Sequence, residues 1–130
     1  MIYNAISIKQ PWADAIIECG KNIENRTWKC PAKFQNRTIL IHAGKRLDLD
    51  ANFIFYPELR DIFMNGTVTG GIVGAFSITS GDLFNLNNRW ADALCFNWEI
   101  ANARRVNFFP CKGSLGFFKV DYPHHVPEVA

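Results

Sequence analysis

The residues most suggestive of chemistry lie in the stretch GKNIENRTWK, residues 20–29. Alternate side chains of a β-strand share one face, so Glu24, Arg26 and Trp28 would point the same way. A carboxylate, a guanidinium and an indole on one face can hydrogen-bond to and stack on a planar polar ligand such as a base. Lys21, in the preceding turn, could neutralise a phosphate, or act as a base or nucleophile if burial lowers its pKa.

A purely structural interpretation of these residues is also open. Glu24 and Arg26 could form a surface ion pair that contributes less than about 1 kcal/mol to stability. Trp28 could simply belong to the core. Spacing alone favours this structural interpretation, so support for a binding site must come from the rest of the chain.

Further candidate ligand contacts lie on either side of that stretch. Lys9, Gln10 and Trp12 occupy the expected junction between the first strand and the first helix. A helix N-terminus attracts anions, so Lys9 and Gln10 could contact a phosphate or a base. His42 ends an expected strand and, with Lys45 beyond it, could border a basic rim. The structural alternatives are a solvated lysine, a core tryptophan and a packed histidine.

The elements that must position these side chains are short. The expected strands are residues 4–9, 22–28, 37–43, 67–80, 104–109 and 115–121. The expected helices are residues 11–19, residues 48–65 with an interruption at Pro57, and a short segment capped by Asn88. Because parallel βαβ alternation is absent, we expect an α+β fold. It would be a small mixed β-barrel of about five or six strands with two or three flanking helices.

Composition narrows the functional class. The length of 130 residues predicts one domain over residues 1–130. A net charge of +2 permits an anionic ligand but does not indicate a bulk phosphate binder. Four scattered cysteines without a C-x-x-C pair, and only three histidines, argue against zinc, and we expect neither metal nor cofactor. The N-terminus does not have the pattern of a signal peptide, and no apolar run reaches membrane-spanning length, so we expect a cytoplasmic protein without membrane contact.

Four blocks of sequence, taken in order, resemble the ASCH domain, the activating-signal-cointegrator homology domain of the PUA-like superfamily. The blocks are SIKQPWADAIIECGKNIENRTW (7–28), ILIHAGK (39–45), GGIVGAFSI (70–78) and WEIANARRVNFFPCKGSLGFF (98–118). The family's hallmark G-x-K-x-x-E-x-R is represented by Gly20, Lys21, Glu24 and Arg26. The chain is most similar in character to stand-alone bacterial, phage and EOLA-like members.

The resemblance implies a barrel with a helix near its mouth and a cleft, lined by Lys21, Glu24 and Arg26, that receives RNA or a nucleotide. One bacterial branch of the family hydrolyses the acetyl amide of 4-acetylcytidine with the hallmark lysine, a threonine and a later glutamate. Here Lys21 matches, but Glu24 occupies the position of the threonine. Glu58 and Glu99 are the candidates for the later glutamate. Another branch has been described as ribonucleases.

We therefore expect an ASCH domain that binds RNA or a modified nucleotide or nucleoside. The expected ligand contacts are Lys9, Gln10, Trp12, Lys21, Glu24, Arg26, Trp28, His42 and Lys45. Whether the protein is an enzyme stays open; if it is, Lys21 and Glu24 would be catalytic. The alternatives are a hydrolase, either an amidohydrolase of the 4-acetylcytidine type or a ribonuclease, and a protein-interaction module of a transcription or RNA-processing complex.

Overall fold

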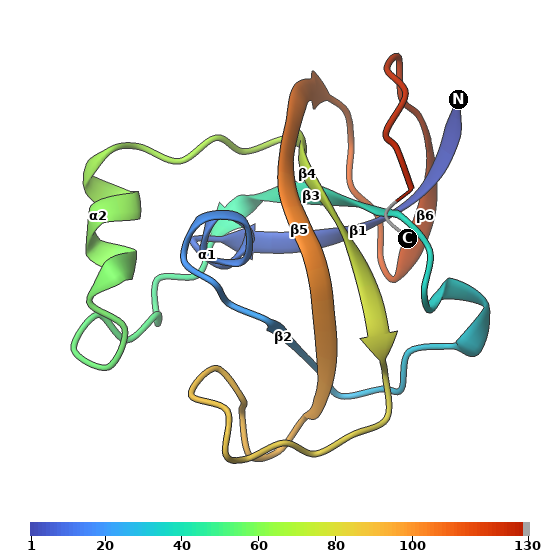
Figure 1. Cartoon of the computed structure of the whole chain (residues 1–130). Helices are drawn as coiled ribbons and strands as arrows, with labels where there is room; N and C mark the ends of the chain where they lie inside the picture. The colour runs from blue at the N-terminus through green and yellow to red at the C-terminus, as the bar shows by residue number, and fades with distance from the viewer. Residues whose placement is uncertain (129–130) are drawn as a thin grey trace.

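The computed structural model describes residues 1–128 (Figure 1). The strands are β1 (Ile2–Gln10), β2 (Ile23–Arg26), β3 (Ile39–Leu47), β4 (Gly71–Ser80), β5 (Phe96–Pro110) and β6 (Phe117–Asp121). The helices are α1 (Trp12–Glu18), α2 (Glu58–Met64) and a single 3-10 turn, η1 (Ala32–Phe34).

The strands form one mixed sheet in the order β2-β5-β4-β3-β1-β6. Within residues 1–128, only β1 and β3 pair in parallel; every other neighbouring pair is antiparallel. Figure 1 shows β4 and β5 crossing β1 and β3 at a steep angle, as expected of a strongly twisted sheet. The α+β class, six strands and two α-helices are therefore confirmed. The sheet is not closed, because its edge strands β2 and β6 do not pair with each other, so the expected barrel is not confirmed.

The segment before α2 differs from the expected helix over residues 48–65. Side-chain oxygens of Asp48 and Asn52 accept hydrogen bonds from nearby backbone N–H groups at 2.9–3.0 Å and form turns instead. The helix begins only after Pro57. Near Asn88 no helix forms, because its side chain accepts the backbone N–H of Trp90 in a turn. Of these two expected helices, the first is shorter than predicted and the second does not form, for the same reason: Asp and Asn side chains compete with the helical hydrogen bonds of the backbone.

One long strand replaces the expected short strand over residues 104–109. β5 runs for 15 residues and begins at Phe96. It is bent by irregular pairing with β4, and Asn102 within it has a positive φ of 59°. These irregularities interrupt the simple alternation of apolar residues that identifies a strand in a sequence.

The main core lies beneath the first half of β5. Trp98 is fully buried and stacks parallel to Phe117, with ring centroids 5.9 Å apart. Trp28 meets Trp98 edge-on at 4.9 Å, and its backbone carbonyl accepts the indole N–H of Trp98 at 3.1 Å. A smaller cluster around Leu59 and Ala15 joins α2 to α1. The position of α1 is therefore fixed by the sheet on one side and by α2 on the other.

Close packing of α1 against β4 depends on Gly74. A Cβ atom at this position would lie 2.5 Å from Ile17 Cδ1 and 2.7 Å from the carbonyl oxygen of Arg104. We expect Gly74→Ala to lower the free energy of unfolding by about 1–3 kcal/mol, the usual cost of overpacking. Gly44→Ala is the matched control, because a Cβ there meets nothing within 4 Å and should change stability by less than about 0.5 kcal/mol. Urea denaturation measures both, and equal midpoints would contradict the close approach of α1.

Candidate ligand-binding cavity

A cavity of about 510 Å³ opens between α1, β2 and two loops, residues 48–57 and 81–95. This volume lies within the range of small-molecule sites. The lining residues are Ser7, Ile8, Lys9, Trp12, Lys21, Glu24, Asn25, Arg26, Asp48, Asp50, Asn52, Tyr56, Trp90 and Asp92. They come from three separate parts of the chain, residues 7–26, 48–56 and 90–92, which the fold brings together.

Lys21 enters the cavity from the turn that follows α1. Gly20 has a φ of 71°, a conformation suited to glycine, and it turns the chain from the helix towards β2. The Lys21 side chain is only 3% exposed. Its ammonium group donates to the carbonyl oxygen of Ile23, lies 3.6 Å from Glu24 Oε1 and is 5.6 Å from the centre of the Trp12 ring. Burial lowers the pKa of Lys21, and the neighbouring Glu24 carboxylate opposes this shift.

Glu24 and Arg26 lie on one face of β2, as expected from their spacing. The Glu24 side chain is 8% exposed, and its Oε2 accepts both Arg26 Nε at 3.1 Å and Arg26 Nη2 at 2.8 Å. Arg26 Nη2 also donates to the carbonyl oxygen of Ser7 at 2.8 Å, which attaches β2 to β1. The guanidinium carbon is 6.0 Å from the centre of the Trp98 ring. Lys21, Glu24 and Arg26 thus form one buried charged cluster at the cavity.

Aromatic side chains form the wall next to this cluster. Tyr56 and Trp90 stack in parallel, with centroids 4.7 Å apart. Trp12 meets Tyr56 edge-on at 5.6 Å, and its indole N–H donates to Asp48 Oδ2 at 2.7 Å. The wall therefore offers flat apolar surface held in place by hydrogen bonds, an arrangement suited to a planar ligand.

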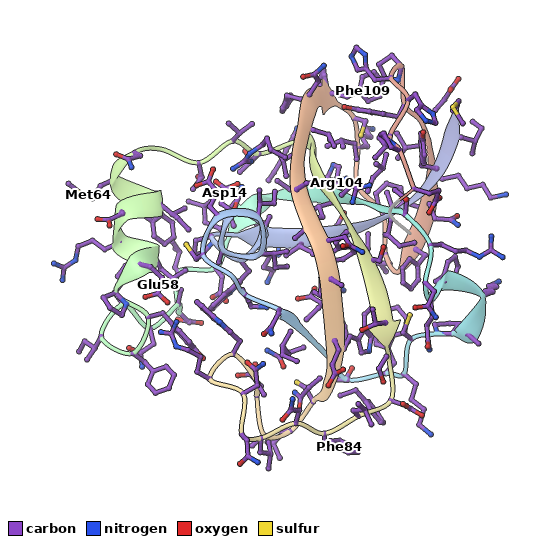
Figure 2. The ribbon with its side chains drawn as sticks, viewed as in Figure 1. Asp14, Glu58, Met64, Phe84, Arg104 and Phe109 are labelled. Carbon is purple, nitrogen blue, oxygen red and sulfur yellow. The ribbon has the colours of Figure 1, made fainter. Side chains whose placement is uncertain are left out.

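Arg89 holds the two loops of the aromatic wall together. Its guanidinium lies 4.4 Å from the Trp90 ring centre, and it hydrogen-bonds Glu58 at the start of α2 (Figure 2) and the carbonyl oxygen of Phe55. The hydroxyl of Tyr56 donates to the carbonyl oxygen of Arg89 at 2.7 Å. The hydrogen bond from Arg89 lowers the pKa of Glu58. Arg89 does not line the cavity, but it connects the segments that do.

Asn25 anchors the same loop from β2. Its side-chain amide donates to the carbonyl oxygen of Trp90 at 2.9 Å, and its oxygen accepts from the backbone N–H of Asp92 and from Asn97 Nδ2. Asn97 is fully buried on β5. These bonds fix Trp90 and Asp92 relative to Glu24.

The charged residues that line the cavity differ in sign and in burial. Lys9, Lys21 and Arg26 are the basic lining residues, and Glu24, Asp48, Asp50 and Asp92 are the acidic ones. The Lys21–Glu24–Arg26 cluster is buried or half-buried, whereas the Lys9, Asp50 and Asp92 side chains are exposed at the mouth. An incoming ligand therefore meets acidic groups on the loops and a basic group on β1.

Five of the nine expected ligand contacts line the cavity: Lys9, Trp12, Lys21, Glu24 and Arg26. The other four do not. Gln10 is fully buried, where its side chain donates to the carbonyl oxygen of Val68 and accepts the backbone N–H of Asp14. Trp28 packs in the core, because β2 ends at Arg26 and the chain turns before it.

His42 and Lys45 also lie outside the cavity. His42 is buried on β3, with Nδ1 2.9 Å from Ser7 Oγ and Nε2 2.8 Å from the carbonyl oxygen of Cys111. Lys45 is exposed near the end of β3. Glu58 and Glu99, the candidates for a later catalytic glutamate, do not line it either.

Sequence reasoning missed the two loops of the cavity. Asp48, Asp50, Asn52 and Tyr56 fall in the segment expected to be helical, and Trp90 and Asp92 in a segment without a clear pattern. The sequence DLDAN (48–52), with polar residues at alternate positions and Tyr56 four residues later, could have indicated a loop at the cavity. Such a pattern is typical of Asx turns, which present side chains and not a helical face.

The fold and the cavity together define a small α+β domain with a polar, aromatic-walled cavity beside its first helix. Residues 6–110 match the model of the ASCH domain, so the chain belongs to the ASCH domain family, which is associated with RNA binding. The search of curated proteins found no match. In this chain Gly20 directly precedes Lys21, without the intervening residue of the hallmark, whereas the K-x-x-E-x-R spacing is intact.

Two further findings concern the described residues 1–128. None of their helices is both long and apolar enough to cross a membrane. In the same residues, no three His, Cys, Asp or Glu side chains gather as metal ligands would.

The Arg89 contacts predict the effect of removing this side chain. Arg89→Ala should lower the free energy of unfolding by about 1 kcal/mol, since a partly exposed ion pair and the cation–π contacts with Tyr56 and Trp90 are lost. It should also make Trp90 more accessible to acrylamide quenching. Arg60→Ala, an exposed position on α2, is the matched control. If the two variants quench alike, Arg89 does not hold the wall.

The lowered pKa of Lys21 predicts a pH-dependent contribution to stability. Between this pKa and the ordinary value of 10.5, the unfolded chain binds more protons at Lys21 than the folded protein does, so stability rises with pH. The free energy of unfolding of the wild type, relative to Lys21→Met, should therefore increase as the pH rises from the lowered pKa towards 10.5. Urea denaturation of both proteins across this range measures it, and titration of other groups cancels in the difference. A constant or falling difference would contradict the lowered pKa.

Proposed function

We propose that the cavity binds one base of RNA, or a modified nucleoside, between the aromatic wall and the Lys21–Glu24–Arg26 cluster. The observation that carries this proposal is the convergence of Lys21 and Arg26 on the Glu24 carboxylate inside a single cavity. A buried charged cluster costs desolvation free energy, and an open cavity beside it is the typical setting of a functional site.

Each side chain has a role that follows from its contacts. Arg26 occupies one oxygen of Glu24, so the carboxylate is held in place and keeps lone pairs free to accept from a base amino group. Trp12 supplies a stacking surface and is oriented by its bond to Asp48. Lys21 lies between Trp12 and Glu24, where it can donate to a ring nitrogen or an exocyclic oxygen.

A second candidate function is hydrolysis of an acylated base, which the lowered pKa of Lys21 favours. In its neutral form Lys21 can take a proton from water. The resulting hydroxide would attack the acyl carbon, the amide C–N bond would break, and the proton would pass to the leaving amine. Arg26 would stabilise the negative charge that develops on the acyl oxygen.

One experiment separates binding from hydrolysis. The protein is incubated with 4-acetylcytidine, and separately titrated into a labelled single-stranded RNA of about twelve nucleotides at several salt concentrations, which report phosphate contacts. The variants are Lys21→Met, Trp12→Leu and, as control, Lys29→Met, an exposed lysine of the same segment outside the cavity. Binding that falls at least about fivefold in Trp12→Leu, consistent with one lost stacking contact, supports the base-binding proposal.

The hydrolysis arm has its own outcome. Cytidine and acetate formed by the wild type and by Lys29→Met, but not by Lys21→Met, would establish the enzyme. Binding without product supports the binding function alone. If the wild type neither binds RNA nor converts 4-acetylcytidine, both candidate functions fail.

A further inference from the structure

Four exposed basic side chains lie beside the cavity on the side of β1. Lys9 lines the cavity mouth itself. In the parallel pairing of β1 with β3, Ile8 is opposite Ala43 and Gln10 is opposite Leu47, which places Lys45 and Arg46 next to Lys9.

The segment after β5 brings Lys112 to the same place. Lys45 packs against Gly70, with its Cε 3.5 Å from the position of a Cβ there. The carbonyl oxygen of Gly70 accepts the backbone N–H of Cys111 at 3.2 Å. Gly113 lies directly against the Ser7 hydroxyl and the His42 ring on β1 and β3. Lys9, Lys45, Arg46 and Lys112 are therefore neighbours across three segments, and we call them the basic strip.

The side chains of the strip have no partners within the described residues 1–128. None donates a hydrogen bond or forms an ion pair, whereas Lys21, Arg26, Arg89 and Arg105 all do so with acidic residues. Unpaired charges of one sign raise the local positive potential and attract anions.

Acidic side chains also line the cavity. Asp50 and Asp92 are exposed on the two loops, whereas the Asp48 carboxylate accepts the indole N–H of Trp12 and its backbone N–H donates to the carbonyl oxygen of Gln10 at 2.7 Å. A phosphate leaving the cavity would be repelled from the loops and attracted to the strip. Among the charged residues around the mouth, the strip therefore offers the cations that are free to contact the phosphates of a polynucleotide backbone.

We propose that the ligand is a single polynucleotide strand, with one base in the cavity and its phosphodiester backbone on the basic strip, and not a free nucleoside. This inference rests on the proposed function of the cavity. The cavity supplies contacts to the base, and the strip supplies the affinity that depends on chain length. The phosphodiester backbone is common to RNA and DNA, so both are tested.

The test compares two charge-reversed double variants of the whole chain. Lys45→Glu/Lys112→Glu alters the strip, and Lys33→Glu/Lys119→Glu is the control with the same change in net charge at exposed positions outside strip and cavity. Fluorescence anisotropy measures binding to the labelled RNA of about twelve nucleotides, to DNA of the same sequence and to competing cytidine. All four lysines are exposed, so folding should persist, which circular dichroism checks.

The strip variant should lose affinity for the strand by about tenfold relative to the control, and the slope of log K against log salt should fall by about 1.4, for two lost phosphate contacts. Its affinity for cytidine should not change. Loss for RNA alone would assign the strip to RNA, and equal loss for DNA would assign it to any single strand.

The failure of this inference differs from failure of the proposed function. If Trp12→Leu weakens binding of the nucleic-acid strand but the strip variant binds it with the same affinity as the control variant, the cavity binds a base and the role proposed for the strip is contradicted. If cytidine binds as tightly as the strand, the commitment to a polynucleotide is wrong. If the wild type binds neither strand nor cytidine, the proposed function itself fails.

Discussion

The structure depends on one buried carboxylate. Glu24 sits on the short edge strand β2, and Arg26 and Lys21 approach it from two sides. Desolvation of three charged groups is costly, and it is tolerated because each cation also has a backbone acceptor, Ser7 for Arg26 and Ile23 for Lys21. Removal of the Glu24 carboxylate would take away the acidic group that both cations share. The cluster thereby joins the end of α1, β2 and β1, elements that the backbone pairing of the sheet does not connect directly.

The sheet and its loops supply what this cluster needs. β2 has only four residues and a single strand neighbour, β5, so side-chain contacts must complete its attachment. Trp98 is opposite Glu24 in the ladder and supports Arg26 from the core. Asn25, on the other face of β2, fixes the loop that carries Trp90. Successive side chains of a strand point to opposite faces. One short strand therefore positions the charged cluster with Glu24 and Arg26 on one face, and the loop of the aromatic wall with Asn25 on the other.

The sequence predicted the parts of this arrangement that are local. The strand alternation of residues 22–28 predicted a common face for Glu24 and Arg26, and the helix expected over residues 11–19 forms as α1. The absence of parallel βαβ alternation predicted the α+β class, whereas the barrel that the family resemblance implied is not confirmed, because the sheet stays open. Trp28 could not be separated from Glu24 and Arg26 by spacing, because the turn that ends β2 depends on packing against Trp98 and Phe117. Tyr56 and Trp90 reach the cavity through contacts between distant loops, chiefly those of Arg89, and Asp48 reaches it through its hydrogen bonds to Trp12 and Gln10; no local pattern encodes such contacts.

The protonation state of Lys21 decides how the same cluster would act. A charged Lys21 satisfies Glu24, and the site is then a rigid set of donors and acceptors suited to reading a base. A neutral Lys21 leaves Glu24 with Arg26 as its remaining cationic partner and provides a lone pair for proton transfer. Burial favours the neutral form and Glu24 favours the charged one. A bound base that displaces water from the cavity would increase the desolvation and weaken screening of the Glu24 charge, so ligand entry acts on both sides of this balance. Glu24, which stands where the deacetylase branch has threonine, adds to the side that keeps Lys21 charged, and this favours recognition of a base over hydrolysis.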